Sequence, residues 1–265
     1  MPFSFSAAAN GFVHICGHRG HSLGAPENTL PAFAAARDLG ATTCEIDTVL
    51  SRDGVIVVMH DLLVDRTTNG EGAARDLSAT EIAGLDAGSW FAPQFAGTTV
   101  PNLTEALAAA HDLGLGYEVE VKEKLDLPAY TQALRVALAD PADRERTMII
   151  SFDHASLKAM KAAIPGLATG GIVHERYADP VAVARAADLD QLCIDLDVFD
   201  LADAERLHEA GITIRCHAFS PNTLDLARRA GLPWEETLRT ALEAGLIDML
   251  SGDDVGWLQS FVAED

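Results

Sequence analysis

The sequence is poor in basic residues, in aromatic residues and in long apolar runs. Its 19 Lys and Arg residues stand against 40 Asp and Glu residues, a formal net charge of −21, and only 6% of residues are aromatic. Such a charge repels the phosphate backbone of nucleic acids and the surface of anionic membranes. Apolar runs such as residues 55–59 are far shorter than the roughly 20 residues of a membrane-spanning helix. We therefore expect neither nucleic-acid binding nor stable membrane association.

The sequence also lacks the features of a secreted, disulfide-bonded protein. Residues 1–12 have neither the basic stretch nor the continuous apolar segment of a secretory signal. The four cysteines, Cys16, Cys44, Cys193 and Cys216, are widely separated, and each lies in a segment that we predict below to be a strand. This pattern favours free thiols in a reducing compartment over disulfides. We expect a cytoplasmic protein.

The chain is long enough to bury a full core, with 265 residues of which 48% are hydrophobic. Short apolar runs alternate with Ala- and Leu-rich segments of helical spacing, which is typical of a parallel sheet flanked by helices. The predicted strands are 14–18, 42–47, 116–122, 147–152, 168–173, 191–196, 213–217 and 247–251. The predicted helices are 29–39, 103–113, 129–138, 155–163, 180–187, 202–210, 233–244 and 254–262. This order predicts a single α/β domain over 1–265, a TIM-type (β/α)8 barrel with an insertion at about 48–101.

The insertion explains why one connection is about 70 residues long when most others are about 20 to 35. It contains Asp53-Gly54, and Asp-Gly is the strongest two-residue hairpin signal. If these two residues form the turn, Asp47 lies opposite His60, and the hairpin returns His60 to the mouth of the barrel. We interpret the remainder, residues 62–101, as a cap over that mouth.

Carboxylates gather at the predicted strand ends, where such barrels carry their reactive side chains. Glu45 and Asp47 are two positions apart and project from one face of a strand, and Glu120 lies near the end of the next barrel strand. Neighbouring carboxylates repel unless a proton or a cation lies between them. Three carboxylates with water suit Mg²⁺ or Ca²⁺, whereas zinc favours His and Cys. We predict one divalent cation on Glu45, Asp47 and Glu120.

Basic and titratable side chains lie at the same strand ends. Arg19 offers the bidentate geometry that suits phosphate, and Lys122 supplies a second positive charge. Local cations on an acidic protein predict a specific anion site. His18 and His60 form a natural acid–base pair, because histidine titrates near neutral pH.

A purely structural interpretation of these charges stays open. In this alternative, Glu45 and Asp47 are ordinary salt-bridge partners of Arg19 and Lys122. Glu118 lies one pair of positions deeper in its strand, and we expect it to form a structural ion pair rather than to bind the cation.

A series of motifs resembles the glycerophosphodiester phosphodiesterase family. In chain order these motifs are His18-Arg19-Gly20, Pro26-Glu27-Asn28-Thr29, Glu45-Ile46-Asp47, Asp53-Gly54, His60-Asp61, Arg66-Thr67-Thr68 with Gly70, and Glu120-Val121-Lys122. The match is dense from residue 17 to about 105 and sparser beyond. The resemblance implies a TIM-type barrel of the phospholipase C-like phosphodiesterase kind, with a small insertion after the second strand.

The resemblance also implies roles for the residues that match the motifs. The three carboxylates named above would hold a divalent cation, commonly Mg²⁺ or Ca²⁺, and the two histidines would act as general acid and base. Arg19 and Lys122 would contact phosphate, and Glu27 would lie close to the metal site.

Two strand ends depart from the family. Many members carry Trp-Thr followed shortly by Asn near the penultimate strand, where this chain has residues 215–219, Arg-Cys-His-Ala-Phe. The last strand commonly ends in Thr-Asp, where this chain has Ser251-Gly252-Asp253. These positions form the opposite wall of the pocket, which we expect His217 to line. The departures bear on the alcohol group of the substrate more than on the reaction.

The implied activity is metal-dependent hydrolysis of a small glycerophosphodiester to sn-glycerol 3-phosphate and a free alcohol. Three alternatives stay open. A lysophospholipase D-like activity on lysolipids needs an exposed apolar rim on residues 62–101. A non-catalytic phosphate-ligand-binding barrel needs no acid–base pair. A metal-dependent sugar isomerase or aldolase has only the analogy of the fold in its favour. The sequence indicates no oligomeric interface.

Overall fold

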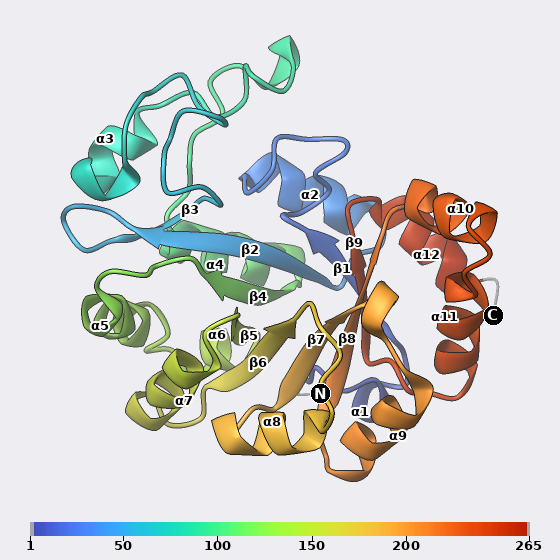
Figure 1. Cartoon of the computed structure of the whole chain (residues 1–265). Helices are drawn as coiled ribbons and strands as arrows, with labels where there is room; N and C mark the ends of the chain where they lie inside the picture. The colour runs from blue at the N-terminus through green and yellow to red at the C-terminus, as the bar shows by residue number, and fades with distance from the viewer. Residues whose placement is uncertain (1–2, 264–265) are drawn as a thin grey trace.

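Eight parallel strands close into a barrel in the computed structural model, which describes residues 3–263 (Figure 1). The strands are β1 (His14–His18), β2 (Thr43–Leu50), β4 (Gly116–Val121), β5 (Thr147–Ser151), β6 (Ala168–Val173), β7 (Gln191–Asp195), β8 (Thr213–Phe219) and β9 (Met249–Gly252). The sheet closes because β1 pairs with both β2 and β9. A further strand, β3 (Ile56–Val58), pairs antiparallel to β2. The predicted TIM-type barrel is confirmed.

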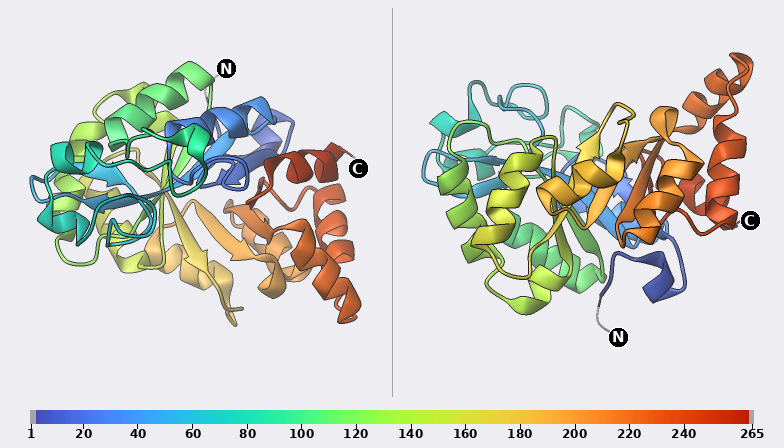
Figure 2. Two further views of the ribbon diagram at one scale, coloured as in Figure 1. Left: turned by 90° about the horizontal axis from the view of Figure 1, so that it is seen from above. Right: turned by 60° about the horizontal axis from the view of Figure 1, so that its bottom comes forward.

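Helices lie on the outside of the strands (Figure 2). Those that correspond to the eight predicted helices are α2 (Leu30–Asp38), α4 (Leu103–Leu113), α5 (Leu127–Ala137), α7 (His154–Ala163), α8 (Pro180–Ala187), α9 (Leu201–Glu209), α11 (Trp234–Glu243) and α12 (Val255–Ala263). Four helices were not predicted: α1 (Ala7–Asn10), α3 (Ala79–Ala83), α6 (Pro141–Glu145) and α10 (Pro221–Arg229). Three short 3₁₀ turns are η1 (Ala74–Asp76), η2 (Pro93–Phe95) and η3 (Leu196–Val198). No helix in the described part of the chain has the length and apolarity to cross a membrane.

Aspartates fix where several helices begin. The side chains of Asp126, Asp153, Asp179 and Asp200 each accept a backbone N–H from the first turn of α5, α7, α8 and α9. Such a cap satisfies a donor that the helix cannot pair itself, and its charge complements the helix dipole. Part of the acidic excess is therefore used to start the helices that follow the strands.

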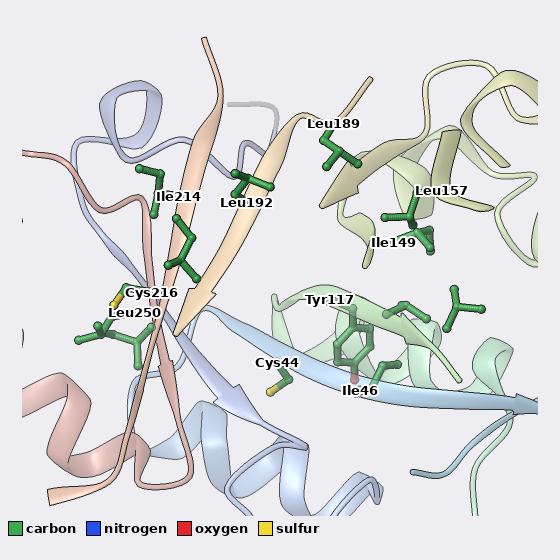
Figure 3. Packing of buried hydrophobic residues seen from close by; sticks show 14 of the residues in the cluster. Cys44, Ile46, Tyr117, Ile149, Leu157, Leu189, Leu192, Ile214, Cys216 and Leu250 are labelled. Atoms are coloured by element: carbon green, nitrogen blue, oxygen red, sulfur yellow. The ribbon is translucent and has the colours of Figure 1, made fainter. Parts of the chain in front are cut away.

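The alternation of side chains along the strands separates two cores. Outward-facing residues such as Cys44, Ile46 and Tyr117 are buried in the main core beneath the helices (Figure 3). Inward-facing residues such as Met148 and Ile150 form a second cluster inside the barrel. All four cysteines are buried and free, as predicted.

The amino-terminal end of the barrel is closed by the residues before β1. Phe5 packs into the cluster inside the barrel. The backbone N–H of Ala7 donates to Asp248 Oδ1 at 2.9 Å, and the His14 ring lies 2.8 Å from the Thr42 hydroxyl. These contacts leave the opposite, carboxyl-terminal end of the strands for the site.

A buried ion pair crosses the barrel interior. Arg215 Nη1 donates to Glu118 Oε2 at 2.8 Å, and the two residues are 5% and 0% exposed. Arg215 Nε also donates to Ser251 Oγ at 3.0 Å, and Gln191 Nε2 donates to the other oxygen of Glu118. The expectation of a structural ion pair at Glu118 is confirmed.

The predicted pairing of the β2–β3 hairpin is wrong by one residue. Thr48 pairs with Val58, and the N–H of Met59 donates to the carbonyl oxygen of Asp47 at 2.8 Å. Asp47 is therefore opposite Met59, and His60 is the next residue along the chain.

The cause of this shift is a wider turn than Asp-Gly alone predicts. The N–H of Ser51 donates to the Val55 carbonyl at 2.9 Å, and the Ser51 hydroxyl both accepts from the N–H of Val55 and donates to Asp53. Three residues, 52–54, thus make the turn, and Gly54 supplies the positive φ of 78°. The side-chain hydrogen bonds of Ser51 override the two-residue turn signal.

The rest of the insertion packs against this hairpin on one side of the barrel (Figure 1). Val49 and Val57 from the hairpin share a small apolar cluster with Val64, Ile82 and Val100. The insertion therefore has its own core, separate from the two cores of the barrel.

We predict that Glu118→Gln lowers the free energy of unfolding by about 3–5 kcal/mol, because it leaves the buried Arg215 guanidinium without its counter-charge. Urea denaturation followed by circular dichroism measures this loss. Arg228→Gln is the control, since Arg228 pairs with Glu235 at 2.6 Å in an exposed position, and an exposed pair contributes at most about 1 kcal/mol. Equal losses in the two variants would contradict the account.

Candidate active site

Three buried carboxylates meet at the carboxyl-terminal end of β2 and β4. Glu45 and Asp47 project inward from β2, and the parallel register places Asp47 beside Glu120 of β4. Each of the three offers an oxygen that lies within 4.8 Å of the others, and their exposures are 1%, 0% and 7%. The structure thus brings the three predicted cation ligands together.

The charge states of the two β2 carboxylates differ. Burial and the neighbouring charge of Asp47 raise the pKa of Glu45 to about 8. Burial also acts to raise the pKa of Asp47, but the positive charges of Lys122 and Arg19 outweigh it and hold that pKa below its ordinary value. Without a cation, one carboxylate is ionised and the other holds a proton at neutral pH.

Glu45 is the carboxylate whose hydrogen bonding is incomplete. Its Oε2 accepts the backbone N–H of Arg19 at 3.1 Å, whereas its Oε1 is buried and has no hydrogen-bond partner. A buried carboxylate oxygen without a donor is costly. Together with the all-oxygen donor set, this oxygen fits a hard divalent cation.

Two basic side chains lie against these carboxylates. Arg19 Nε lies 3.1 Å from Asp47 Oδ2, and Lys122 Nζ lies 3.2 Å from Asp47 Oδ1 and 2.6 Å from Glu120 Oε1. The structural alternative, in which the carboxylates only pair with basic groups, therefore describes Asp47 and Glu120. It does not account for Glu45, whose side chain forms no ion pair with either.

Each predicted acid–base histidine is held by a carboxylate. His18 Nδ1 lies 2.7 Å from Asp253 Oδ1, and its Nε2 lies 3.8 Å from Glu45 Oε2. His60 Nδ1 lies 2.6 Å from Asp61 Oδ1. In both cases Nδ1 is engaged and Nε2 is the ring atom that remains for proton transfer.

The contacts of the two histidines with their carboxylate partners shift pKa values in both pairs. Burial acts to lower the pKa of His18, but the hydrogen bond to Asp253 and the charge of Glu45 raise it above its ordinary value. The hydrogen bond from Arg66 lowers the pKa of Asp61 to about 2, with a smaller effect from His60. Asp61 therefore stays ionised beside His60 throughout the neutral range.

Glu27 lies where two guanidinium groups meet. Arg19 Nη1 donates to its Oε1 at 2.9 Å, and Arg66 donates to both of its oxygens at 2.8 and 2.9 Å. Arg66 also donates to Asp61 at 2.6 Å. Glu27 thus joins Arg19 to the insertion residue that orients Asp61, and it does not touch the three-carboxylate cluster directly.

The sequence does not predict the contacts that several residues make in the site. Asn28 donates to Asp47 Oδ2 at 2.9 Å and accepts the Asp47 N–H at 3.0 Å. Asn28 and Arg66 lie within the motifs quoted above, but neither motif indicates what the side chain contacts. Asp253 was identified only as a departure from the family, and its contact with His18 joins opposite ends of the sequence.

His217 lies on the wall next to His18. The two ring centroids are 5.1 Å apart, and His217 Nδ1 lies 2.9 Å from Ser251 Oγ. Burial, followed by the nearby charge of His18, lowers the pKa of His217 well below its ordinary value. His217 is therefore an uncharged ring at this side of the mouth.

Residues 18–247 match the model of the Glycerophosphoryl diester phosphodiesterase family. A glycerophosphodiester phosphodiesterase of Caldanaerobacter subterraneus is 41% identical over 157 residues, which are 59% of this chain and 65% of that protein. A putative glycerophosphodiester phosphodiesterase of Bacillus subtilis is 34% identical over 165 residues, 62% of this chain and 68% of that protein. The chain thus aligns with about two thirds of the length of these relatives.

Solved structures of similar fold cover nearly the whole chain. An Oleispira antarctica phosphodiesterase in complex with the product sn-glycerol-3-phosphate has a TM-score of 0.81 and 26% identity, and the match covers 97% of this chain and 99% of that one. A glycerophosphodiester phosphodiesterase of Agrobacterium tumefaciens has a TM-score of 0.76 and 25% identity, with 95% and 100% covered.

We predict that Mg²⁺ or Ca²⁺ raises the melting temperature of the wild-type protein and that Glu45→Gln abolishes this rise, because a ligand that binds only the folded state stabilises it. Thermal denaturation with cation or with chelator measures the effect. Asp38→Asn, an exposed change at the end of α2, is the control and should keep the rise. An undiminished rise in Glu45→Gln would exclude Glu45 as a ligand.

The same variant tests the charge state of Glu45 without cation. Folding raises the pKa of Glu45 from 4.5 to about 8, so the folded protein binds the proton more tightly than the unfolded chain. The wild-type protein should therefore lose stability relative to Glu45→Gln as the pH rises through this interval.

Proposed function

This chain belongs to the glycerophosphoryl diester phosphodiesterase family, and we propose that it hydrolyses small glycerophosphodiesters to sn-glycerol 3-phosphate and an alcohol. The observation that carries the proposal is a pair of histidines from two separate segments, His18 and His60. Each is held by a carboxylate, and each is close enough for its charge to act on the buried carboxylate cluster. The relative from O. antarctica holds the product of such a reaction.

One divalent cation, Mg²⁺ or Ca²⁺, would be held by Glu45, Asp47 and Glu120. Such a cation neutralises charge on phosphate oxygens and lowers the pKa of a bound hydroxyl or water. The buried oxygen of Glu45 that lacks a donor supports this assignment.

Arg19 and Lys122 would contact the phosphate group. Each is partly exposed, with 19% and 18% of its side chain accessible, so a substrate can reach the face that Asp47 does not cover. The negative charge of Asp47 and Glu120 raises the pKa of Lys122 despite its burial, which keeps it positively charged at the pH of catalysis.

His18 and His60 would divide the proton transfers between them. One removes the proton from the attacking hydroxyl or water, and the other protonates the departing alcohol oxygen. Asp253 and Asp61 fix the ring orientations and stabilise the protonated rings. Glu27 and Arg66 act through Asp61 and Arg19, so they are positioning residues in this mechanism.

A second candidate, lysophospholipase D-like activity, is favoured by an apolar pocket beside the site. The pocket has a volume of about 250 Å³, and its walls include Val49, Leu62 and Leu125. Leu62 and Leu125 are 51% and 69% exposed, and the three residues follow Asp47, His60 and Lys122 by two or three positions. An acyl chain on the glycerol unit would fit beside the cation in this pocket.

We expect release of glycerol 3-phosphate from glycerophosphocholine, glycerophosphoethanolamine or glycerophosphoglycerol in the presence of Mg²⁺ or Ca²⁺, and its loss with chelator. An enzyme-coupled assay for glycerol 3-phosphate measures it. Lysophosphatidylcholine tested in parallel distinguishes the second candidate. A protein that hydrolyses none of these substrates with either cation would overturn both candidates.

We predict that His18→Gln and His60→Gln each lower turnover by about 10²–10⁴-fold, the typical contribution of a positioned acid or base. His111→Gln, an exposed change on α4, is the matched control and should retain full turnover. Steady-state kinetics with saturating cation measure the effect. Full activity in the His60 variant would remove the acid–base assignment.

A further inference from the structure

The mouth of the barrel has two chemically different halves. Ile150, Ile172 and Cys193 face inward from β5, β6 and β7, and Arg215 faces inward from β8 to meet Glu118. Because side chains alternate along a strand, the next inward positions lie two residues further, at the mouth. On these four strands they are Phe152, His174, Asp195 and His217. The other four strands carry at their ends the carboxylate cluster, the basic residues and the contact of His18 with Asp253, whereas His60 and Asp61 follow β3 in the insertion.

Aromatic rings line this second half. The rings of Phe152 and His174 are 4.6 Å apart, and those of His217 and Phe219 are also 4.6 Å apart. Asp195 lies between the two pairs, since it pairs in register with His217 on one side and accepts a hydrogen bond from His174 on the other. The half is thus two ring pairs that flank a carboxylate.

Phe219 is held at this place by a costly backbone conformation. Its φ is 61°, a region that bulky residues rarely adopt and that clusters at functional sites. A bulge between His217 and Phe219 creates this conformation. Gly252 accommodates it, because a Cβ there would lie 2.5 Å from the Phe219 carbonyl oxygen.

The same conformation occurs elsewhere at the mouth. Among the described non-glycine residues, positive φ is found at Arg19, Asn28, Asp188 and Phe219. Arg19 and Asn28 contact the carboxylate cluster, and Asp188 ends α8. Phe219 is therefore the counterpart, on the aromatic half, of two residues that build the charged half.

This half carries no fixed positive charge at the mouth that would repel a cation. None of its four inward positions at the mouth carries Lys or Arg. His174 is matched by Asp195, and Arg176 in the following loop is engaged by Asp200 and Asp203. Aromatic faces beside a carboxylate are the usual recognition site for an ammonium group.

We propose that Phe152, Phe219 and Asp195 bind the leaving alcohol of the substrate and select alcohols that carry an ammonium group, as choline and ethanolamine do. The inference rests on the proposed function. Its geometry follows from His217, whose ring contacts His18 on one side and Phe219 on the other. The aromatic half therefore lies directly beside His18, the proposed acid–base residue, and so next to the bond that breaks.

The test compares kcat/KM for glycerophosphocholine with kcat/KM for glycerophosphoglycerol, whose leaving alcohol is neutral. We expect the wild-type ratio to favour choline at least tenfold, and Phe152→Ala and Phe219→Gly each to lower the ratio by about three- to thirtyfold, the range of a cation–π contact. Asp195→Asn should also lower it. Phe12→Ala removes a ring that is 49% exposed next to the start of β1 and should leave the ratio unchanged.

Phe219→Gly separates binding from a merely structural role. Glycine adopts positive φ without strain, which offsets part of the packing that the Phe219 ring loses against the main core, so the variant should still fold while its choline preference falls. If it does not fold, Phe152→Ala decides, because that ring is 44% exposed.

The outcomes distinguish the inference from the function on which it rests. Hydrolysis of neither substrate overturns the proposed function and the inference with it. Hydrolysis of both with a wild-type ratio near one, or with a ratio that both Phe variants leave within twofold of wild type, overturns the inference alone.

Discussion

The structure depends on the neutralisation of several carboxylates that are buried inside one barrel. Four glutamate and aspartate side chains, Glu45, Asp47, Glu118 and Glu120, project inward from two adjacent strands, and like charges in a medium of low dielectric repel strongly. Different basic residues neutralise these charges in the interior and at the mouth of the barrel. Arg215 neutralises Glu118 in the interior, and at the mouth Asp47 and Glu120 meet Arg19 and Lys122. Glu45 forms an ion pair with neither Arg19 nor Lys122, and its ion-pair partner is His18, whose Nε2 lies 3.8 Å from Glu45 Oε2. The buried oxygen of Glu45 that lacks a donor is the feature of the mouth that fits the proposed cation.

A second layer of ion pairs connects this cluster to the histidines. Arg19 joins the cluster to Glu27, Glu27 joins Arg66, and Arg66 holds Asp61 against His60. On the other side, His18 lies between Glu45 and Asp253. A barrel strand and an insertion are thus held in one continuous electrostatic network. In the proposed mechanism, changes in Glu27 or Arg66 would therefore act through the position of His60, not through contact with substrate.

Much of the fold could be predicted because its signals are local. Eight apolar runs and eight helical segments are periodic in the sequence. Strand alternation places Glu45 with Asp47, and the deeper position of Glu118 in its strand indicates its structural role. The predictions fail where side-chain hydrogen bonds or contacts between distant segments determine the structure. The hydroxyl of Ser51 widened the hairpin turn and shifted its pairing. The short helix α6 and the polar helix α10 bury few residues, so each offers few apolar positions by which a helix can be recognised. The contacts of His18 with Asp253 and of His174 with Asp195 join segments 235 and 21 residues apart, and no spacing in the sequence indicates them.

The separate core of the insertion has a consequence for the dynamics of the site. His60 and Arg66 lie on a segment that is held by its own small apolar cluster, whereas Glu45, Asp47 and Glu120 lie on central strands of the barrel. Local opening is easiest where few apolar residues are buried. We therefore expect the insertion to open more easily than the barrel strands that carry the carboxylates. In the proposed mechanism, a cation would then stay bound to a molecule that has momentarily lost one of its two histidines, so the fraction of molecules that hold a cation and the fraction able to react would be two different populations.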